Sequence, residues 1–167
     1  MKNVLTKTVF GDTLNKTMTL NESLTLLKSS NLLNEGELAE QAVSIKSKVL
    51  RCKRNKKGYD LVNGAEIKFS NTNVQSNGNL VAYVTKKHNN GTIFSIINET
   101  LTKKQYFFVF PEEIYTKVKG STFSPSFHRN GLPRRDSIGA INWWQYEVKS
   151  FAILCRLARK YKKPEIN

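Results

Sequence analysis

The residues whose types and spacing could best support a chemical reaction are two acids and an amine that lie close together in the sequence. Asp60 ends a short apolar run, a turn at Asn63 and Gly64 follows, and Glu66 and Lys68 lie at the start of the next run. Asn-Gly between two strand-like runs predicts a β-hairpin. Side chains two residues apart on a strand share a face, so Glu66 and Lys68 should point the same way, with Asp60 beside them.

Two carboxylates held in one cluster repel each other unless a cation lies between them. Carboxylate oxygens, completed by waters and substrate phosphate, are typical ligands of Mg²⁺, and the bound ion can activate water for phosphodiester hydrolysis. Asp60, Glu66 and Lys68 therefore predict a Mg²⁺ site, in which Mn²⁺ should be able to substitute. The alternative interpretation is that Asp60 caps a turn while Glu66 and Lys68 form a solvated ion pair of little energetic value.

The overall charge favours a phosphate-rich partner. The chain has 167 residues, with 27 Lys and Arg against 13 Asp and Glu, a formal net charge of +14 and a pI near 9.9. Such an excess attracts nucleic acid or an anionic membrane surface in a salt-dependent way. No apolar run reaches the roughly 18 residues of a membrane span, and the N-terminus lacks a secretory pattern. We expect a cytoplasmic protein of a bacterial or phage-infected cell that is not secreted and has no membrane partner.

The helices that must position the acids can be outlined from periodicity. The length fits one domain with a substantial core, and residues 1–20 are expected to form an arm or a short hairpin. One helix is predicted over Asn21–Leu33 and a second from about Glu35 to Leu50. Glu37 and Glu40 flank opposite edges of the apolar arc of the second helix. The helical wheel alone does not choose between these two acids as a site residue.

Downstream of Lys68, three strands are predicted, over residues 80–85, 92–97 and 105–110. Pro111 should open a short helical turn. The segment 120–136 is predicted to be irregular and is too long for an idle connector. A final helix is predicted from about Ile138 to Tyr161, with two adjacent tryptophans in its apolar body.

Two basic segments are candidates for contact with DNA. The first lies just before Asp60 and contains Arg51, Lys53, Arg54, Lys56 and Lys57. The second lies in the 120–136 segment and contains His128, Arg129, Arg134 and Arg135. Arginine reads guanine edges and grips phosphates, while aromatic rings stack on bases. A solvated surface loop is the alternative interpretation of the second segment.

A second acidic constellation competes with the first. Asp136, Glu147 and Lys149 repeat the order Asp, then Glu-x-Lys. The segment around them is predicted to be helical, and residues two apart on a helix do not share a face. We therefore favour the first constellation as the site.

The order of these features resembles the PD-(D/E)XK nuclease superfamily. It consists of a helix carrying a Glu, a basic connector, and then an Asp, a turn and Glu-x-Lys. More narrowly, Gly36–Val43, Tyr59–Val62 and Ile67–Lys68 are similar to segments of its homing-endonuclease and Holliday-junction-resolvase branches. The alignment that this resemblance implies places the helical carboxylate at Glu40 rather than Glu37.

The resemblance implies roles for the site residues and a fold. Asp60 and Glu66 would hold Mg²⁺, with the Ile67 carbonyl as a further ligand. Glu40 would orient water at the metal or complete its shell, and Lys68 would position the attacking water and stabilise the charge of the transition state. The implied fold is α/β, a restriction-endonuclease-like mixed β-sheet of about five strands flanked by helices, in a single nuclease domain over residues 1–167.

We therefore expect a Mg²⁺-dependent, site-specific endonuclease that hydrolyses phosphodiester bonds of double-stranded DNA, of the homing or restriction type. One active site cuts one strand, so a double-strand cut favours a homodimer. The alternatives are a non-catalytic basic protein that binds nucleic acid and a Holliday junction resolvase.

Overall fold

The computed structural model describes residues 34–52, 59–86, 91–135 and 141–163. The helix predicted over Asn21–Leu33 and the arm at 1–20 lie outside the described residues. The described part has a mixed α/β fold, as the sequence predicted. Within it, no helix has the length and apolar character needed to cross a membrane.

The helix predicted to begin near Glu35 is present as α3 (Glu35–Ser47). Asn34 caps it: the Asn34 side chain accepts a hydrogen bond from the Glu37 N–H at 3.0 Å, and the Asn34 N–H donates to the Glu37 carboxylate at 3.2 Å. This reciprocal capping box pairs backbone donors at the helix start. The last helical residue is Ser47, because the capping residue Lys48 has a left-handed φ of 60°. The prediction placed the end of this helix slightly later, at about Leu50.

The main sheet has four strands among the described residues, where about five were expected. They are β1 (Glu66–Asn71), β5 (Ile93–Asn98), β6 (Gln105–Phe110) and β9 (Glu147–Val148), in the order β1-β5-β6-β9. β1 pairs parallel with β5, whereas β5 with β6 and β6 with β9 pair antiparallel. The sheet is therefore mixed, and β1 forms one of its edges.

The turn before β1 forms as predicted, but the hairpin does not. Gly64 has a φ of 87°, and its N–H donates to the Leu61 carbonyl at 2.9 Å. The N–H groups of Asp60 and Leu61 both donate to the Ala65 carbonyl. Leu61 makes its antiparallel bridge with Arg51 instead of with β1. The chain thus turns sharply into β1, with Asp60 at the N-terminal end of that strand.

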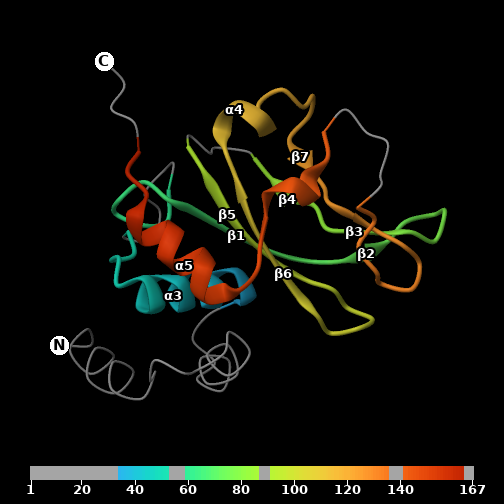
Figure 1. Cartoon of the computed structure of the whole chain (residues 1–167), viewed down its shortest axis with the longest axis horizontal. Helices are drawn as coiled ribbons and strands as arrows, with labels where there is room; N and C mark the ends of the chain where they lie inside the picture. The colour runs from blue at the N-terminus through green and yellow to red at the C-terminus, as the bar shows by residue number, and fades with distance from the viewer. Residues whose placement is uncertain (1–33, 53–58, 87–90, 136–140, 164–167) are drawn as a thin grey trace.

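Different layers cover the two faces of the sheet (Figure 1). α3 and α5 (Phe151–Lys160) pack together on the face that carries Ile67, Phe94 and Ile96. The other face carries Ile93 and Ile97, and it packs against a cluster rich in aromatic rings. Because β5 is covered on both sides, its sequence is an almost continuous apolar run.

Short elements build the second layer. They are β2 (Asn73–Val74), β3 (Leu80–Val81), β4 (Val84–Thr85), α4 (Glu112–Tyr115), β7 (Thr122–Phe123), β8 (Ser126–Phe127) and the 3₁₀ helix η1 (Trp143–Tyr146). The strand predicted over 80–85 is thus split in two, and α4 is the helical turn predicted after Pro111. The segment 120–136 is not wholly irregular, because β7 pairs with β4 and β8 pairs with β3.

The final helix is shorter than predicted. α5 begins at Phe151, where the Ser150 side chain accepts a hydrogen bond from the Ile153 N–H at 3.3 Å. Among the described residues before it, Trp143–Tyr146 form η1 and Glu147–Val148 form β9. Trp144 packs edge-on against Phe127 and β9 pairs with β6, so tertiary contacts override the helical periodicity of this segment.

Candidate active site

Glu66 and Lys68 form a largely buried ion pair at the start of β1. Both side chains extend to the face opposite Ile67. Glu66 is only 6% exposed, and its carboxylate contacts the Lys68 ammonium, whose side chain is 26% exposed. The alternative interpretation required a solvated pair, and the burial of Glu66 contradicts that part of it.

Asp60 is joined to the same strand by its side chain. Its Oδ2 accepts a hydrogen bond from the Ile67 N–H at 2.7 Å, and its carbonyl accepts one from the Cys52 N–H at 2.7 Å. Asp60 therefore does cap the entry into β1, as the alternative interpretation held. The same hydrogen bond also holds the carboxylate next to the residue between Glu66 and Lys68.

Glu40 reaches the cluster from α3, and it brings a counter-ion. Its carboxylate accepts a hydrogen bond from Arg51 Nε at 2.7 Å and also contacts a terminal guanidinium nitrogen of Arg51. Both side chains are mostly buried, at 20% and 23% exposure. Glu37, the other helical acid considered, is engaged in the capping box at the helix start.

The pKa of each of the three carboxylates is raised, and burial is the largest cause in each case. Burial and the charge of Asp60 raise the pKa of Glu66 to about 7, although Lys68 opposes the rise, and Glu40 adds to it. Burial and Asp60 also raise the pKa of Glu40 against the effect of Arg51. Burial raises the pKa of Asp60, whereas the hydrogen bond from the Ile67 N–H and the charges of Lys68 and Arg51 oppose this rise. Raised pKa values in a group of buried acids are a typical property of functional sites.

The carboxylates of Asp60 and Glu66 are oxygen donors of the type that hard divalent cations prefer. Among the described residues, no three His, Cys, Asp or Glu side chains already form a metal cluster. Mg²⁺, however, is usually bound through one or two carboxylates, with waters and substrate phosphate completing the shell. Asp60 and Glu66 offer such oxygens. A cation there would offset both the burial of the Glu66 carboxylate and the charge of Asp60, which together raise the pKa of Glu66.

The residues predicted to contact DNA have different environments. Lys53, Arg54, Lys56 and Lys57 lie outside the described residues. Arg51 is the counter-ion of Glu40. His128 and Arg129 are exposed, and Arg129 donates to the Asn77 carbonyl at 2.7 Å. Arg134 is half-buried, whereas exposed Arg135 lies 5.0 Å over the ring of Trp144. Contact between these side chains and DNA stays a prediction.

The competing constellation has a different geometry from the predicted one. Glu147 lies in the strand β9 rather than on a helix, so the reason given above for disfavouring it was wrong. Its carboxylate is instead paired with Arg135 at 2.6 Å. Lys149 is exposed in the chain leading to α5, and Asp136 lies outside the described residues.

Sequence reasoning missed the contacts that hold the turn before β1. The Asn63 side chain donates to the Ala158 carbonyl at 2.7 Å and to the Tyr161 carbonyl at 3.0 Å, at the C-terminal end of α5. The Tyr161 hydroxyl in turn accepts a hydrogen bond from the Thr92 N–H at 3.1 Å, just before β5. Asn63 had been interpreted only as a turn former, and its amide carries no sequence signal for a partner so far along the chain.

No protein-family model matches the chain, and no curated protein matches it. Among solved structures, the chain is similar to the bacterial homing endonuclease I-Ssp6803I, with a TM-score of 0.41 and 20% identity over 68% of this chain and 83% of that chain. A likeness of this degree carries no argument about activity. The function is therefore argued from the residues of the chain itself.

Proposed function

We propose that the protein is a divalent-metal-dependent nuclease that hydrolyses phosphodiester bonds of DNA. The observation that carries the proposal is the largely buried Glu66–Lys68 pair. The Asp60 side chain is hydrogen-bonded to the same strand, and Glu40 lies close enough to raise the pKa of Glu66. These acids occur in a protein with a net charge of +14. The basic surface would attract the polyanion, while the acids would repel its phosphates unless a cation is bound between them.

Asp60 and Glu66 would hold Mg²⁺, or Mn²⁺ in its place, with the Ile67 carbonyl as a further ligand. The bound ion would supply Lewis acidity and make a hydroxide-like nucleophile available near neutral pH.

The other side chains would position water and balance charge. When the ion is bound, Glu66 would coordinate it instead of pairing with Lys68. The Lys68 ammonium would then face the attacking water and the charge that develops on the phosphate. Glu40 would orient that water. Its ion pair with Arg51 opposes the rise in the pKa of Glu40 and so favours the ionised carboxylate that this role needs.

We further propose that the substrate is double-stranded DNA cut at a specific site, in the manner of homing or restriction enzymes, and that a homodimer makes the double-strand cut. A homodimer would supply the two active sites that such a cut requires.

A plasmid-nicking assay with and without Mg²⁺ tests the activity. Asp60→Asn, Glu66→Gln and Lys68→Ala should each lower the cleavage rate by about 100-fold or more, and Lys68→Ala should retain DNA binding. Glu147→Gln and Lys149→Ala are the matched controls, because they change the second Glu-x-Lys and should cut like the unmodified protein.

Undiminished cleavage by the Asp60 or Glu66 variants would remove the proposed site. Salt-dependent binding with no metal-dependent cleavage would instead favour the non-catalytic alternative. Faster cutting of four-way junctions than of linear duplex would favour the resolvase.

A further inference from the structure

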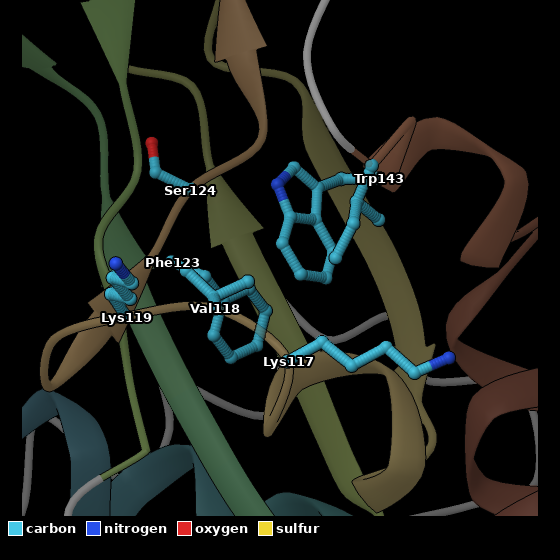
Figure 2. A pocket seen from close by; sticks show the side chains of 7 residues that line it. Lys117, Val118, Lys119, Phe123, Ser124 and Trp143 are labelled. Carbon is cyan, nitrogen blue, oxygen red and sulfur yellow. The ribbon is translucent and has the colours of Figure 1, made fainter.

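A concave surface that shares no residue with the acidic cluster lies between η1 and the chain that follows α4 (Figure 2). This nucleotide-sized pocket has a volume of about 560 Å³. That volume falls within the roughly 300–1,000 Å³ that is typical of small-molecule sites. The lining residues are Lys117, Val118, Lys119, Phe123, Ser124, Ile141 and Trp143. They combine two aromatic rings and two aliphatic side chains with two lysines and one hydroxyl.

The aromatic wall is fixed by packing. The ring centroids of Trp143 and Phe123 are 4.5 Å apart, with an interplanar angle of 31°. The ring of Trp143 also packs edge-on against that of Phe110, with a centroid distance of 5.7 Å. Phe123 is buried and stacks on Tyr115 at 5.7 Å. Trp143 is only half-buried, so part of the indole faces the pocket. The protein therefore presents a rigid aromatic surface there.

The basic wall is also held in place. Lys86 donates from its ammonium to the carbonyls of Tyr115, at 3.3 Å, and of Val118. This anchors the chain on which Lys117 and Lys119 lie. Both lysines are exposed, and neither forms an ion pair with any described residue. Figure 2 shows their side chains extending to opposite sides of Phe123, so their charges flank the aromatic surface.

We propose that the pocket binds one unstacked nucleotide of a nucleic acid, with the base against Trp143 and Val118 and the adjoining phosphates near Lys117 and Lys119. The choice of a nucleotide rests on the proposed nuclease function. An aromatic surface accepts the π-face of any base, and flanking cations follow the backbone. A simple anion would not need the aromatic wall. An apolar ligand would not need the two ammonium groups, which form no ion pair with any described residue. The nucleotide could come from a single strand or be extruded from a duplex.

A fluorescence titration in metal-free buffer tests the proposal. The probe is a single-stranded oligonucleotide with one 2-aminopurine, whose emission is quenched when it stacks on an aromatic ring. The unmodified protein should quench it saturably. A duplex with one extrahelical 2-aminopurine is the second arm: stronger quenching of this duplex identifies an extruded base, and stronger quenching of the single strand identifies a strand end or gap.

Variants of the two walls give the discriminating results. Trp143→Ala should weaken binding by about tenfold and remove the quenching, and Trp143→Phe should restore binding. Lys117→Glu combined with Lys119→Glu should weaken binding by about tenfold or more, whereas Lys160→Glu, on α5 at the opposite face, should change it by about twofold at most. Circular dichroism and thermal melting verify that each variant folds.

Three results would overturn the assignment: no saturable quenching of either probe, normal binding by a folded Trp143→Ala protein, or equal weakening by Lys160→Glu. Because cleavage is not measured, the two proposals can fail separately. Quenching without any nuclease activity would retain the pocket, and cleavage without quenching would retain the nuclease.

Discussion

Glu66 is the residue at which burial and a neighbouring negative charge act together. Its pKa rises from 4.5 to about 7 in the folded protein. A carboxyl group that ionises less readily when folded stabilises the fold fully only below its unfolded pKa, and that contribution is lost as the pH rises through the folded pKa. The protein should therefore lose stability from this group between about pH 4.5 and pH 7.

This titration predicts how Glu66→Gln and Mg²⁺ change thermal stability. In metal-free buffer, the melting temperature of the unmodified protein should fall, relative to that of Glu66→Gln, as the pH rises through about 7. Above that pH, Mg²⁺ should raise the melting temperature of the unmodified protein more than that of the variant, because binding needs the ionised carboxylate. Parallel pH profiles for the two proteins would contradict the assigned pKa, and equal responses to Mg²⁺ would contradict the metal site.

Among the elements, the turn after β8 is docked on the β5–β6 connection. Glu99 is fully buried, and its carboxylate accepts hydrogen bonds from the N–H groups of Leu101 at 2.9 Å and Thr102 at 2.6 Å. Gly131 lies against this carboxylate with a φ of 78°, so a Cβ there would stand 2.6 Å from Glu99 Oε2. The turn that displays His128 and Arg129 thus lies so close to the β5–β6 connection that its backbone leaves room only for glycine at position 131.

Two glycine substitutions separate backbone strain from steric overlap. Gly131→Ala should lower the free energy of unfolding by about 2 kcal/mol or more, because it combines a left-handed φ with the overlap on Glu99. Gly120→Ala should cost only about 1 kcal/mol, because its φ of 87° is similar but open space surrounds it. Urea denaturation measures both values. A cost for Gly120→Ala as large as that for Gly131→Ala would show that the contact with Glu99 contributes nothing.

At the scale of the whole molecule, the proposed function gives separate tasks to the strong positive charge and to the local acidic cluster. The net charge of +14 favours association with DNA from a distance. Not every arginine of the 120–136 segment is equally available for it. Arg129 lies on an exposed turn and donates to the uncharged Asn77 carbonyl, a contact that does not neutralise its charge. The charge of Arg135 is instead paired with Glu147 at 2.6 Å, and its guanidinium lies over the ring of Trp144.

This difference predicts unequal effects on the salt dependence of DNA binding. The logarithm of the binding constant should fall linearly with the logarithm of salt concentration, by about 0.9 for each phosphate contacted. Arg129→Ala should reduce that slope by about one, and Arg135→Ala, as the matched control, should change it less. Filter binding or anisotropy in metal-free buffer measures the slopes. An unchanged slope for Arg129→Ala would remove this residue from the DNA-contacting set.

The sequence by itself determined the features that depend on near neighbours. α3 follows from apolar periodicity, and β5 and β6 follow from short apolar runs. α4 follows from Pro111, and the turn at Gly64 follows from its backbone freedom. It also placed Glu66 and Lys68 on one face, since strand geometry alone requires this. Net charge needs no structure at all.

Only the tertiary structure decided which distant groups meet. Periodicity indicated a helix where η1 and β9 form. It could not reveal the pairing of β9 with β6, because β6 lies far from β9 in the sequence. It likewise could not reveal that Asp60 binds the Ile67 N–H, that Arg51 neutralises Glu40, or that Glu66 is buried. The physical reason is the same in each case: burial and ion pairing are properties of packed neighbours, and local sequence patterns do not specify who those neighbours are.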